Sequence, residues 1–557
     1  MTRRQERNAC GILEESMKIN LSKPSAILAR IGLGGIALLV ALAMAFLFIG
    51  CMLGTADMST ENAMQELITF QKDSLLKNIG YLLLFTALGV ALILVLRRLG
   101  WFNRITRWHL SLAIFLWILI TGSAWVLMSM SAPTHDSLIV TRAGIAAALG
   151  EMKYLHEDYF IRFPFQSGYV LWTELWARLF GLDHSSYLFM EFVNVICLAL
   201  GEAALVLTAD KLFGRRDVTF ATTLALAAFF QPVIFSTFLY GNIPGFCFAA
   251  WAVYLFVCYL KHDRWWVLAI SAACLIISVS LKLNNMILLV AMGIILAAHL
   301  LRGKPLRRLI ALVLLCVSVL TLTNVAKLQY EKRLDKELGD GIPMISWMAM
   351  GLHDAPTAPG WYNGKYTVTN FHSAGNDPDA AGEKSKEVIK ERLSYFADNP
   401  KEAADFFGDK ILSQWSETTY QSLWNNQVRG QFMPKYGLAK YVCGEGEDTV
   451  KGWMDLGAQF LYGGMLIAAV YLVISQIKKN PARPEDESAL FLIPLIFLGG
   501  FLYHALFEAK SQYVITYVTF MIPYAIWGFA MISGTVKRLV IRVIDRIRTA
   551  KEKTTES

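Results

Sequence analysis

The sequence predicts an all-α protein that crosses a membrane about twelve times, and three observations lead to this fold class. Of its 557 residues, 55% are hydrophobic and 17% are charged, whereas soluble globular chains carry about 25% charged residues. Several apolar runs reach the length of about 20 residues that one helical crossing requires. Lysine and arginine gather in alternate connections between these runs, as they do in the cytoplasmic loops of membrane proteins.

The apolar runs define twelve predicted spans, nine before a long polar segment and three after it. They cover residues 27–53, 79–97, 109–130, 186–208, 218–238, 244–260, 265–281, 286–301, 308–325, 456–477, 489–507 and 512–533. The predicted organisation is an N-terminal segment 1–26, two N-terminal spans within 27–108, a membrane core 109–325, an outer segment 326–455, C-terminal spans within 456–536 and a basic tail 537–557.

Basic residues set the predicted orientation. The even-numbered connections carry clusters that include Arg97, Arg215 and Lys478, and the tail after residue 536 is also basic, whereas the odd-numbered connections carry no cluster. The positive-inside rule then places both termini in the cytoplasm. The net charge of +8 is therefore a topology signal, and the apolar composition excludes a nucleic-acid partner.

Two long connections are predicted on the outer side. Residues 131–185 contain two stretches, Leu138–Met152 and Tyr169–Leu182, that are too short to cross the bilayer and are expected to lie at its interface. The segment 326–455 contains a predicted helix over Ser385–Gln414 and is expected to form a small α or mixed domain. No nucleotide-binding or hydrolase motif occurs in the chain, so an activated substrate must come from the membrane or from outside.

Asp136 is the first candidate for chemistry, because it follows the third span and precedes an interfacial stretch. A carboxylate at this position is placed to accept a proton from a hydroxyl group. The alternative, which the sequence alone favours, is that Asp136 or Ser137 caps the helix that begins near Leu138.

A second candidate region is 154–168, where His156, Glu157, Asp158 and Arg162 lie among aromatic residues. The acids could hold a sugar hydroxyl or a metal, and Arg162 could bind phosphate. The alternative is an interfacial loop with aromatic anchors. A single histidine beside two acids defines no metal site, so no metal ligand is assigned and a divalent cation is left open as a cofactor.

Lys282 lies at the outer end of the seventh span, where positive charge is disfavoured. An ionisable group in such a place usually has a partner or a function, and phosphate is a natural partner for lysine. The alternative is that the side chain extends to the membrane surface to keep its ammonium in water.

Two outer turns complete the candidates. Tyr240 and Asn242 belong to a Gly- and Pro-rich turn, in which Asn242 either binds in a pocket or only shapes the turn. Glu508, Lys510 and Tyr513 lie between the last two spans, where a charged cluster faces water or a cavity. The alternative is a solvated turn in which Glu508 pairs with Lys510.

These features together resemble the GT-C superfamily of integral-membrane glycosyltransferases, in its bacterial branch of protein O-mannosyltransferase and aminoarabinose transferase type (family 39-like). Asp136 followed by two interfacial stretches matches the plan of these enzymes, and Tyr159–Gly168 resembles their Tyr-Phe-x-Arg-Tyr-Pro-x-x-x-Gly stretch. The segments 282–285, 350–352, 360–363 and 508–513 also look like that branch. The chain departs from the pattern at Asn242, where many members have an acid.

The resemblance implies a GT-C-like core and transfer of a sugar from a polyprenyl-phosphate donor to a hydroxyl of a cell-envelope acceptor, on the outer face of a bacterial plasma membrane and with inversion. Asp136 would be the base, and Lys282 and Arg162 would bind the donor phosphate. The implied substrate-binding residues are His156, Glu157, Asp158, Tyr240, Asn242, Asn285, Trp361, Glu508, Lys510 and Tyr513.

Two alternatives remain open: a transporter or flippase of lipid-linked sugars, and a non-catalytic membrane scaffold. A transporter predicts internal repeats and charges near the midplane, whereas this chain has no repeat and carries its charges at the outer ends of the spans. An enzyme predicts that Asp136, Arg162, Lys282 and Glu508 meet in one cavity, and a scaffold predicts that they are scattered.

Overall fold

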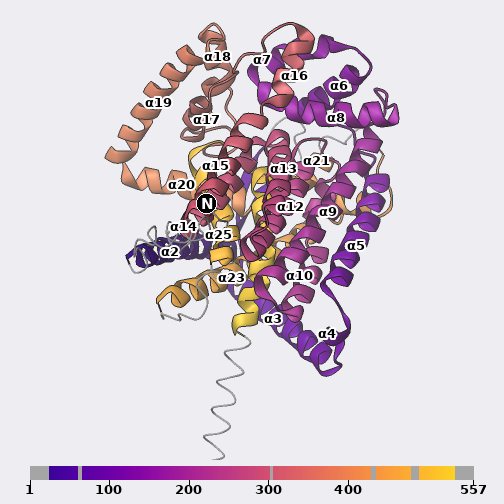
Figure 1. Ribbon diagram of the computed structural model, residues 1–557, viewed down its shortest axis with the longest axis vertical. Coiled ribbons are helices and arrows are strands. Elements are labelled where there is room, and N and C mark those ends of the chain that lie inside the picture. Colours follow the sequence, from indigo (N-terminus) through magenta and orange to yellow (C-terminus); the bar gives the residue numbers. More distant parts are fainter. Residues whose placement is uncertain (1–23, 60–65, 301–304, 428–433, 478–487, 533–557) are drawn as a thin grey trace, which may run out of the picture.

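The computed structural model describes residues 24–59, 66–300, 305–427, 434–477 and 488–532 (Figure 1). The predicted basic clusters that include Lys478 and the tail 537–557, together with residues 1–23, lie outside these ranges. Within the described residues ten helices are long and apolar enough to cross a membrane. The chain is therefore an all-α polytopic membrane protein, as its composition predicts.

The ten helices correspond closely to ten of the predicted spans. They are Ile27–Leu53, Leu75–Arg98, Arg107–Ser129, Tyr187–Phe213, Asn242–His262, Leu283–Leu300, Leu306–Leu334, Glu447–Ile477, Ser488–Leu506 and Ser511–Ile532. In Figure 1 they include α2 (Pro24–Leu53), α3 (Leu75–Arg98), α5 (Arg107–Ser129), α9 (Tyr187–Phe213), α12 (Asn242–His262), α14 (Met286–Leu300), α15 (Pro305–Leu322), α16 (Val325–Leu334), α23 (Glu447–Ile477) and α25 (Leu492–Leu506).

The other two predicted spans have a different form. Residues 265–281 form α13 (Trp265–Leu281), which is apolar but shorter than the ten helices above. Residues 218–238 form two helices, α10 (Arg216–Ala228) and α11 (Gln231–Phe235), with a break at Phe229 and Phe230. Pro232 explains the break, because proline has no N–H group to continue a helix and clashes with the preceding turn.

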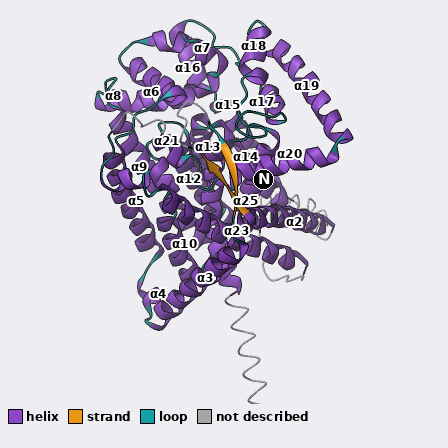
Figure 2. Ribbon diagram, turned by 180° about the vertical axis from the view of Figure 1, so that it is seen from behind, coloured by secondary structure: helices purple, strands orange, loops and turns teal. Residues whose placement is uncertain are grey.

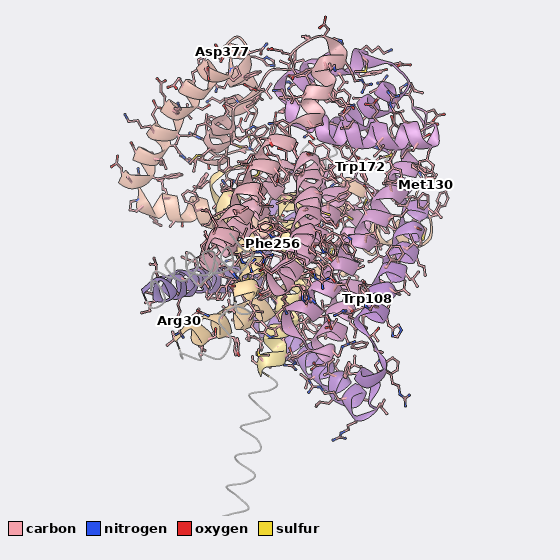
Figure 3. All side chains as sticks on the ribbon, in the orientation of Figure 1. Arg30, Trp108, Met130, Trp172, Phe256 and Asp377 are labelled. Atoms are coloured by element: carbon pink, nitrogen blue, oxygen red, sulfur yellow. The ribbon has the colours of Figure 1, made fainter. Side chains whose placement is uncertain are left out.

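Basic residues collect at one end of the helix bundle. Figure 1 shows α4 (Trp101–Arg104) at the end opposite to α6 and α8, and Figure 3 marks the two ends of α5 by Trp108 and Met130. Near α4, Arg97 pairs with Asp217 of α10, and Arg107 lies 3.4 Å from Asp210 of α9. The connections with clustered lysine and arginine are thus tied to the membrane helices at this end.

The first long connection forms helices at the other end. They are α6 (His135–Ala148), η1 (Met152–His156), α7 (Asp158–Arg162), η2 (Pro164–Gln166) and α8 (Ser167–Phe180). The two expected interfacial stretches correspond to α6 and α8, which lie side by side in both ribbon views (Figures 1 and 2).

The outer segment 326–455 is helical in its described parts. It contains α17 (Met344–Gly351), η4 (Lys365–Thr369), α18 (Asn370–Ser373), α19 (Pro378–Asp398), α20 (Pro400–Trp415), α21 (Ser422–Gln427) and α22 (Gly437–Val442). The predicted helical stretch Ser385–Gln414 is confirmed, but it forms two helices, because Asn399 and Pro400 separate α19 from α20. A residue before proline is driven out of the helical conformation, and Asn399 has φ −127° and ψ 66°.

A β-hairpin joins the first two spans. Its strands β1 (Gly54–Met58) and β2 (Ile68–Lys72) pair antiparallel and are drawn in orange in Figure 2. Ala56, Met58 and Ile68 of the hairpin pack in one buried cluster with Trp361 and Ala509. The connection between the first two spans is therefore packed against the segments that carry Trp361 and Ala509.

Candidate functional site

A cavity of about 1000 Å³ lies at the end of the molecule that carries α6, α7 and α16. Segments far apart in the sequence form its polar walls, among them the α6–α8 connection, the α13–α14 turn, the turn after α25, and the hairpin. Seven of the residues predicted from the sequence line it, namely Asp136, Arg162, Tyr240, Lys282, Glu508, Lys510 and Tyr513.

Asp136 lies in the first turn of α6 with its side chain exposed. The cap of this helix is Thr134, because Ser137 Oγ accepts a hydrogen bond from Thr134 N at 3.1 Å and donates to Thr134 O at 2.8 Å. The interpretation of Asp136 as the cap is thus wrong. No described donor or cation lies within bonding distance of its carboxylate, and the helix dipole favours the negative charge at this terminus.

The turn that carries Lys282 is fixed by close backbone contacts. A Cβ atom on Gly168 would lie 1.8 Å from Ser280 O, and one on Gly241 would lie 1.8 Å from Leu281 O. Such distances are below any non-bonded contact, so only glycine allows α8 and the 240–245 turn to approach the end of α13 in this way. These contacts fix the path of the backbone at the end of α13 and therefore the position of Lys282, the next residue.

The Lys282 ammonium has aromatic neighbours and no carboxylate partner. Its Nζ atom lies 4.9 Å from the centroid of the Tyr240 ring and 4.7 Å from that of Tyr513. No carboxylate of the described residues lies within ion-pair distance, and burial lowers the pKa of Lys282 to about 8. Cation–π contacts return only part of the hydration that a buried ammonium loses. The position therefore favours an anion beside Lys282.

Glu508 and Lys510 do not form the pair that the sequence suggested as an alternative. Lys510 Nζ lies 2.7 Å from Glu66 Oε1. Glu508 instead accepts a hydrogen bond of 3.2 Å from the Tyr513 hydroxyl. Burial raises the pKa of Glu508 to about 7, although the charge of Lys510 acts in the opposite direction. Glu508 therefore changes its charge near neutral pH.

Arg162 lines the cavity from α7. Its Nε atom lies 2.8 Å from Asp158 of the same helix, and Asp158 is also 3.7 Å from His372 of α18. The two terminal guanidinium nitrogens make no hydrogen bond to the described residues. The guanidinium of arginine can bind phosphate through two parallel hydrogen bonds, and these two nitrogens remain available to form them.

Six residues expected at the site lie away from the cavity walls. His156, Glu157 and Asp158 are exposed on the outer surface. The other three are structural: Asn242 donates to Gln512 O at 3.2 Å, Asn285 donates to Ser278 Oγ at 2.8 Å, and the buried Trp361 donates to Ser413 Oγ at 2.8 Å. Trp361, which the resemblance implies as a substrate-binding residue, is part of the core, because its ring has no exposed face.

The structure also adds residues that the sequence did not indicate. Glu66 reaches the cavity from the hairpin, and Tyr362, next to Trp361, lines it as well. His504 of α25 lines the same wall, where its Nδ1 lies 3.0 Å from Glu508 O and its Nε2 is buried without a described partner. In the described chain no three His, Cys, Asp or Glu side chains form a group that could hold a metal ion.

Neither the family models nor the curated proteins that we compared with the chain give a match. Function is thus inferred from the cavity itself, where among the described residues neither the carboxylate of Asp136 nor the ammonium of Lys282 has an ion-pair partner. The cavity can bind an anionic group at Lys282 and accept a proton at Asp136.

Proposed function

We propose that the protein is a membrane glycosyltransferase. The donor is a sugar on a polyprenyl phosphate, the acceptor is a hydroxyl of a cell-envelope molecule, and the transfer takes place on the extracytoplasmic face of a bacterial plasma membrane. One observation carries the proposal: the carboxylate of Asp136 and the ammonium of Lys282 line the same cavity, and neither forms an ion pair with another residue in the described part of the chain. A non-catalytic scaffold gives no reason for this arrangement.

In the proposed reaction Asp136 takes the proton of the acceptor hydroxyl. The acceptor oxygen bonds to the anomeric carbon, and the bond from that carbon to the phosphate oxygen breaks with its electron pair on the phosphate. Lys282 neutralises the phosphate, with Arg162 as a second cation. A single displacement inverts the anomeric configuration. General-base help supplies about 10²- to 10⁴-fold in rate, and charge stabilisation of the leaving group adds a further large factor.

The charges at the two ends of the bundle support the proposed orientation. Arg97, Arg107 and Arg215 lie at the end with α4, and the cavity lies at the other end. The positive-inside rule assigns the α4 end to the cytoplasm. A donor anchored in the outer leaflet could then present its phosphate to Lys282 without leaving the bilayer.

The proposal is tested with purified protein in lipid nanodiscs, a panel of polyprenyl-phosphate sugars and a cell-envelope extract as acceptor. The readout is released polyprenyl phosphate. We expect Asp136→Asn to lower turnover by about 10²- to 10⁴-fold and to leave donor binding nearly unchanged.

Asp340→Asn is the matched control, because Asp340 lines the same cavity but lies 3.1 Å from Lys327 in an ion pair. This variant should keep its turnover. Full turnover in Asp136→Asn would remove the base from the mechanism, and absence of release with every donor would refute the proposed reaction.

A further inference from the structure

Glu66 enters the cavity from outside the membrane core, through the connection between α2 and α3. Its Oε1 atom lies 2.7 Å from Lys510 Nζ and accepts a hydrogen bond of 3.0 Å from Gln421 Nε2. The backbone carbonyl of Glu66 accepts a hydrogen bond of 2.8 Å from Thr357 Oγ1. The Glu66 and Lys510 side chains are each only 14% exposed, so this pair is partly removed from water.

The partners of Glu66 are themselves held in place. Gln421 has φ 59°, a left-handed backbone conformation that residues other than glycine adopt rarely. Its backbone N–H donates to Glu417 Oε2 at 2.8 Å, and both residues are fully buried. A strained conformation of this kind persists only where the surroundings fix it. Gln421 therefore presents its amide to Glu66 from a rigid segment.

The Glu66 pair determines the surroundings of Glu508. Lys510 is two residues from Glu508, yet its ammonium is engaged by Glu66. Glu508 retains the hydrogen bond from Tyr513. The charge of Glu66 also acts on Glu508 directly and raises its pKa, while the charges of Lys510 and Lys282 lower it. The other titratable groups that interact with Glu508 across the packed elements are Lys410, Tyr362 and Tyr503. None of the described lysines or arginines lies within ion-pair distance of it.

We propose that Glu66 is a positioning residue: by holding Lys510 it keeps Glu508 unpaired, so that Glu508 presents a protonated carboxyl to the cavity. A protonated carboxyl can donate a hydrogen bond to an oxygen of the ligand beside Lys282, which a carboxylate cannot do. The inference rests on the proposed function for the identity of that ligand, a phosphorylated sugar donor. It also assigns a role to the two N-terminal spans, which deliver Glu66.

The test is a pH titration of Glu508 in the full-length protein without donor, and infrared difference spectroscopy monitors its protonation. The C=O band of the protonated acid is assigned by its loss in Glu508→Gln. In Glu66→Gln the amide keeps the contact with Gln421 but no longer neutralises Lys510, so the charge of Lys510 acts on Glu508 without opposition from Glu66. We expect the midpoint of Glu508 to fall from about 7 by about one pH unit or more, because an opposite charge nearby lowers a carboxyl pKa by about 1–3.

Two further variants separate positioning from damage to the fold. In the double variant Glu66→Gln/Lys510→Met no ammonium is available, so the midpoint should return to the wild-type value or above it. Asp57→Asn is the matched control, because Asp57 belongs to the same hairpin and pairs with Lys451 at 2.7 Å. Its removal should leave the Glu508 titration unchanged.

The titration tests the positioning role of Glu66 independently of the proposed glycosyl transfer. An unchanged midpoint in Glu66→Gln overturns it, and so does a lowered midpoint that persists in the double variant. Since the titration needs no donor, a lowered midpoint that Lys510→Met restores supports the inference even if no donor is turned over. In that case the proposed reaction fails while the positioning role of Glu66 stands.

Discussion

Replacing Lys282 by methionine should weaken donor binding and at the same time stabilise the donor-free protein. Methionine has a similar length and removes the charge. Burial lowers the pKa of Lys282 from 10.5 to about 8, which at about 1.4 kcal/mol per pH unit corresponds to about 3 kcal/mol. This is the free energy that the charged form loses in the empty cavity and that a bound phosphate can return. Lys282→Met should therefore raise the donor Kd by about 100-fold.

The stability effect has a defined pH dependence. Because the pKa of Lys282 is lower in the folded state than in the unfolded state, the charged lysine destabilises the fold below about pH 8. The penalty disappears as the pH rises to the ordinary value of 10.5. Lys282→Met should thus have a higher Tm than the wild type at pH 7, and the difference should shrink at alkaline pH.

The assay combines thermal melting without donor and calorimetric binding of a polyprenyl-phosphate sugar in nanodiscs, each between about pH 6 and pH 9, which spans the titration of a lysine with a lowered pKa. Lys401→Met is the control, because Lys401 is exposed at the start of α20. It should change neither quantity. A lowered Tm together with unchanged donor affinity in Lys282→Met would refute the assignment of Lys282 to the phosphate.

Two further expectations concern the same cavity. Glu508→Gln should remove the part of the decline in donor affinity that occurs as the pH rises through about 7, where Glu508 ionises, and leave the decline near pH 8 from Lys282. A pH profile of donor binding identical to wild type would contradict this. Gly168→Ala should lower stability by about 1–3 kcal/mol through overpacking, since its Cβ would meet Ser280 O. Gly408→Ala, which meets nothing within 4 Å, should not, and equal melting of the two variants would count against the close contact.

Hydropathy and charge predicted most of the fold, because the length of an apolar run and the position of basic residues have direct physical causes. They did not predict where an apolar run is interrupted within the described residues. The run 218–238 has the composition of a span, but Pro232 divides it into α10 and α11. Composition over a window does not record such a break, and the same holds for Asn399 and Pro400 between α19 and α20.

The candidate site was predictable where a charge is costly. Lys282 and Glu508 stand out as charges beside apolar spans, and both line the cavity together with Asp136, which was indicated by its place after the third span. Asn242 and Trp361 lie outside its walls, where the amide nitrogen of Asn242 donates to Gln512 O and the indole of Trp361 donates to Ser413 Oγ.

Glu66 could not be predicted from the sequence, because its contacts are long-range. Its partners Gln421 and Lys510 are distant in the sequence, and only the packing of the hairpin against the outer segment brings them together. Local sequence patterns carry no record of such long-range pairs.

The most direct measurement is the structure of the Asp136→Asn variant with a polyprenyl-phosphate sugar bound, determined by cryo-electron microscopy in a nanodisc. We expect the phosphate within hydrogen-bond distance of Lys282 Nζ and the anomeric carbon turned toward residue 136. A phosphate bound elsewhere, with the cavity empty or the sugar out of reach of residue 136, would contradict the proposed transfer.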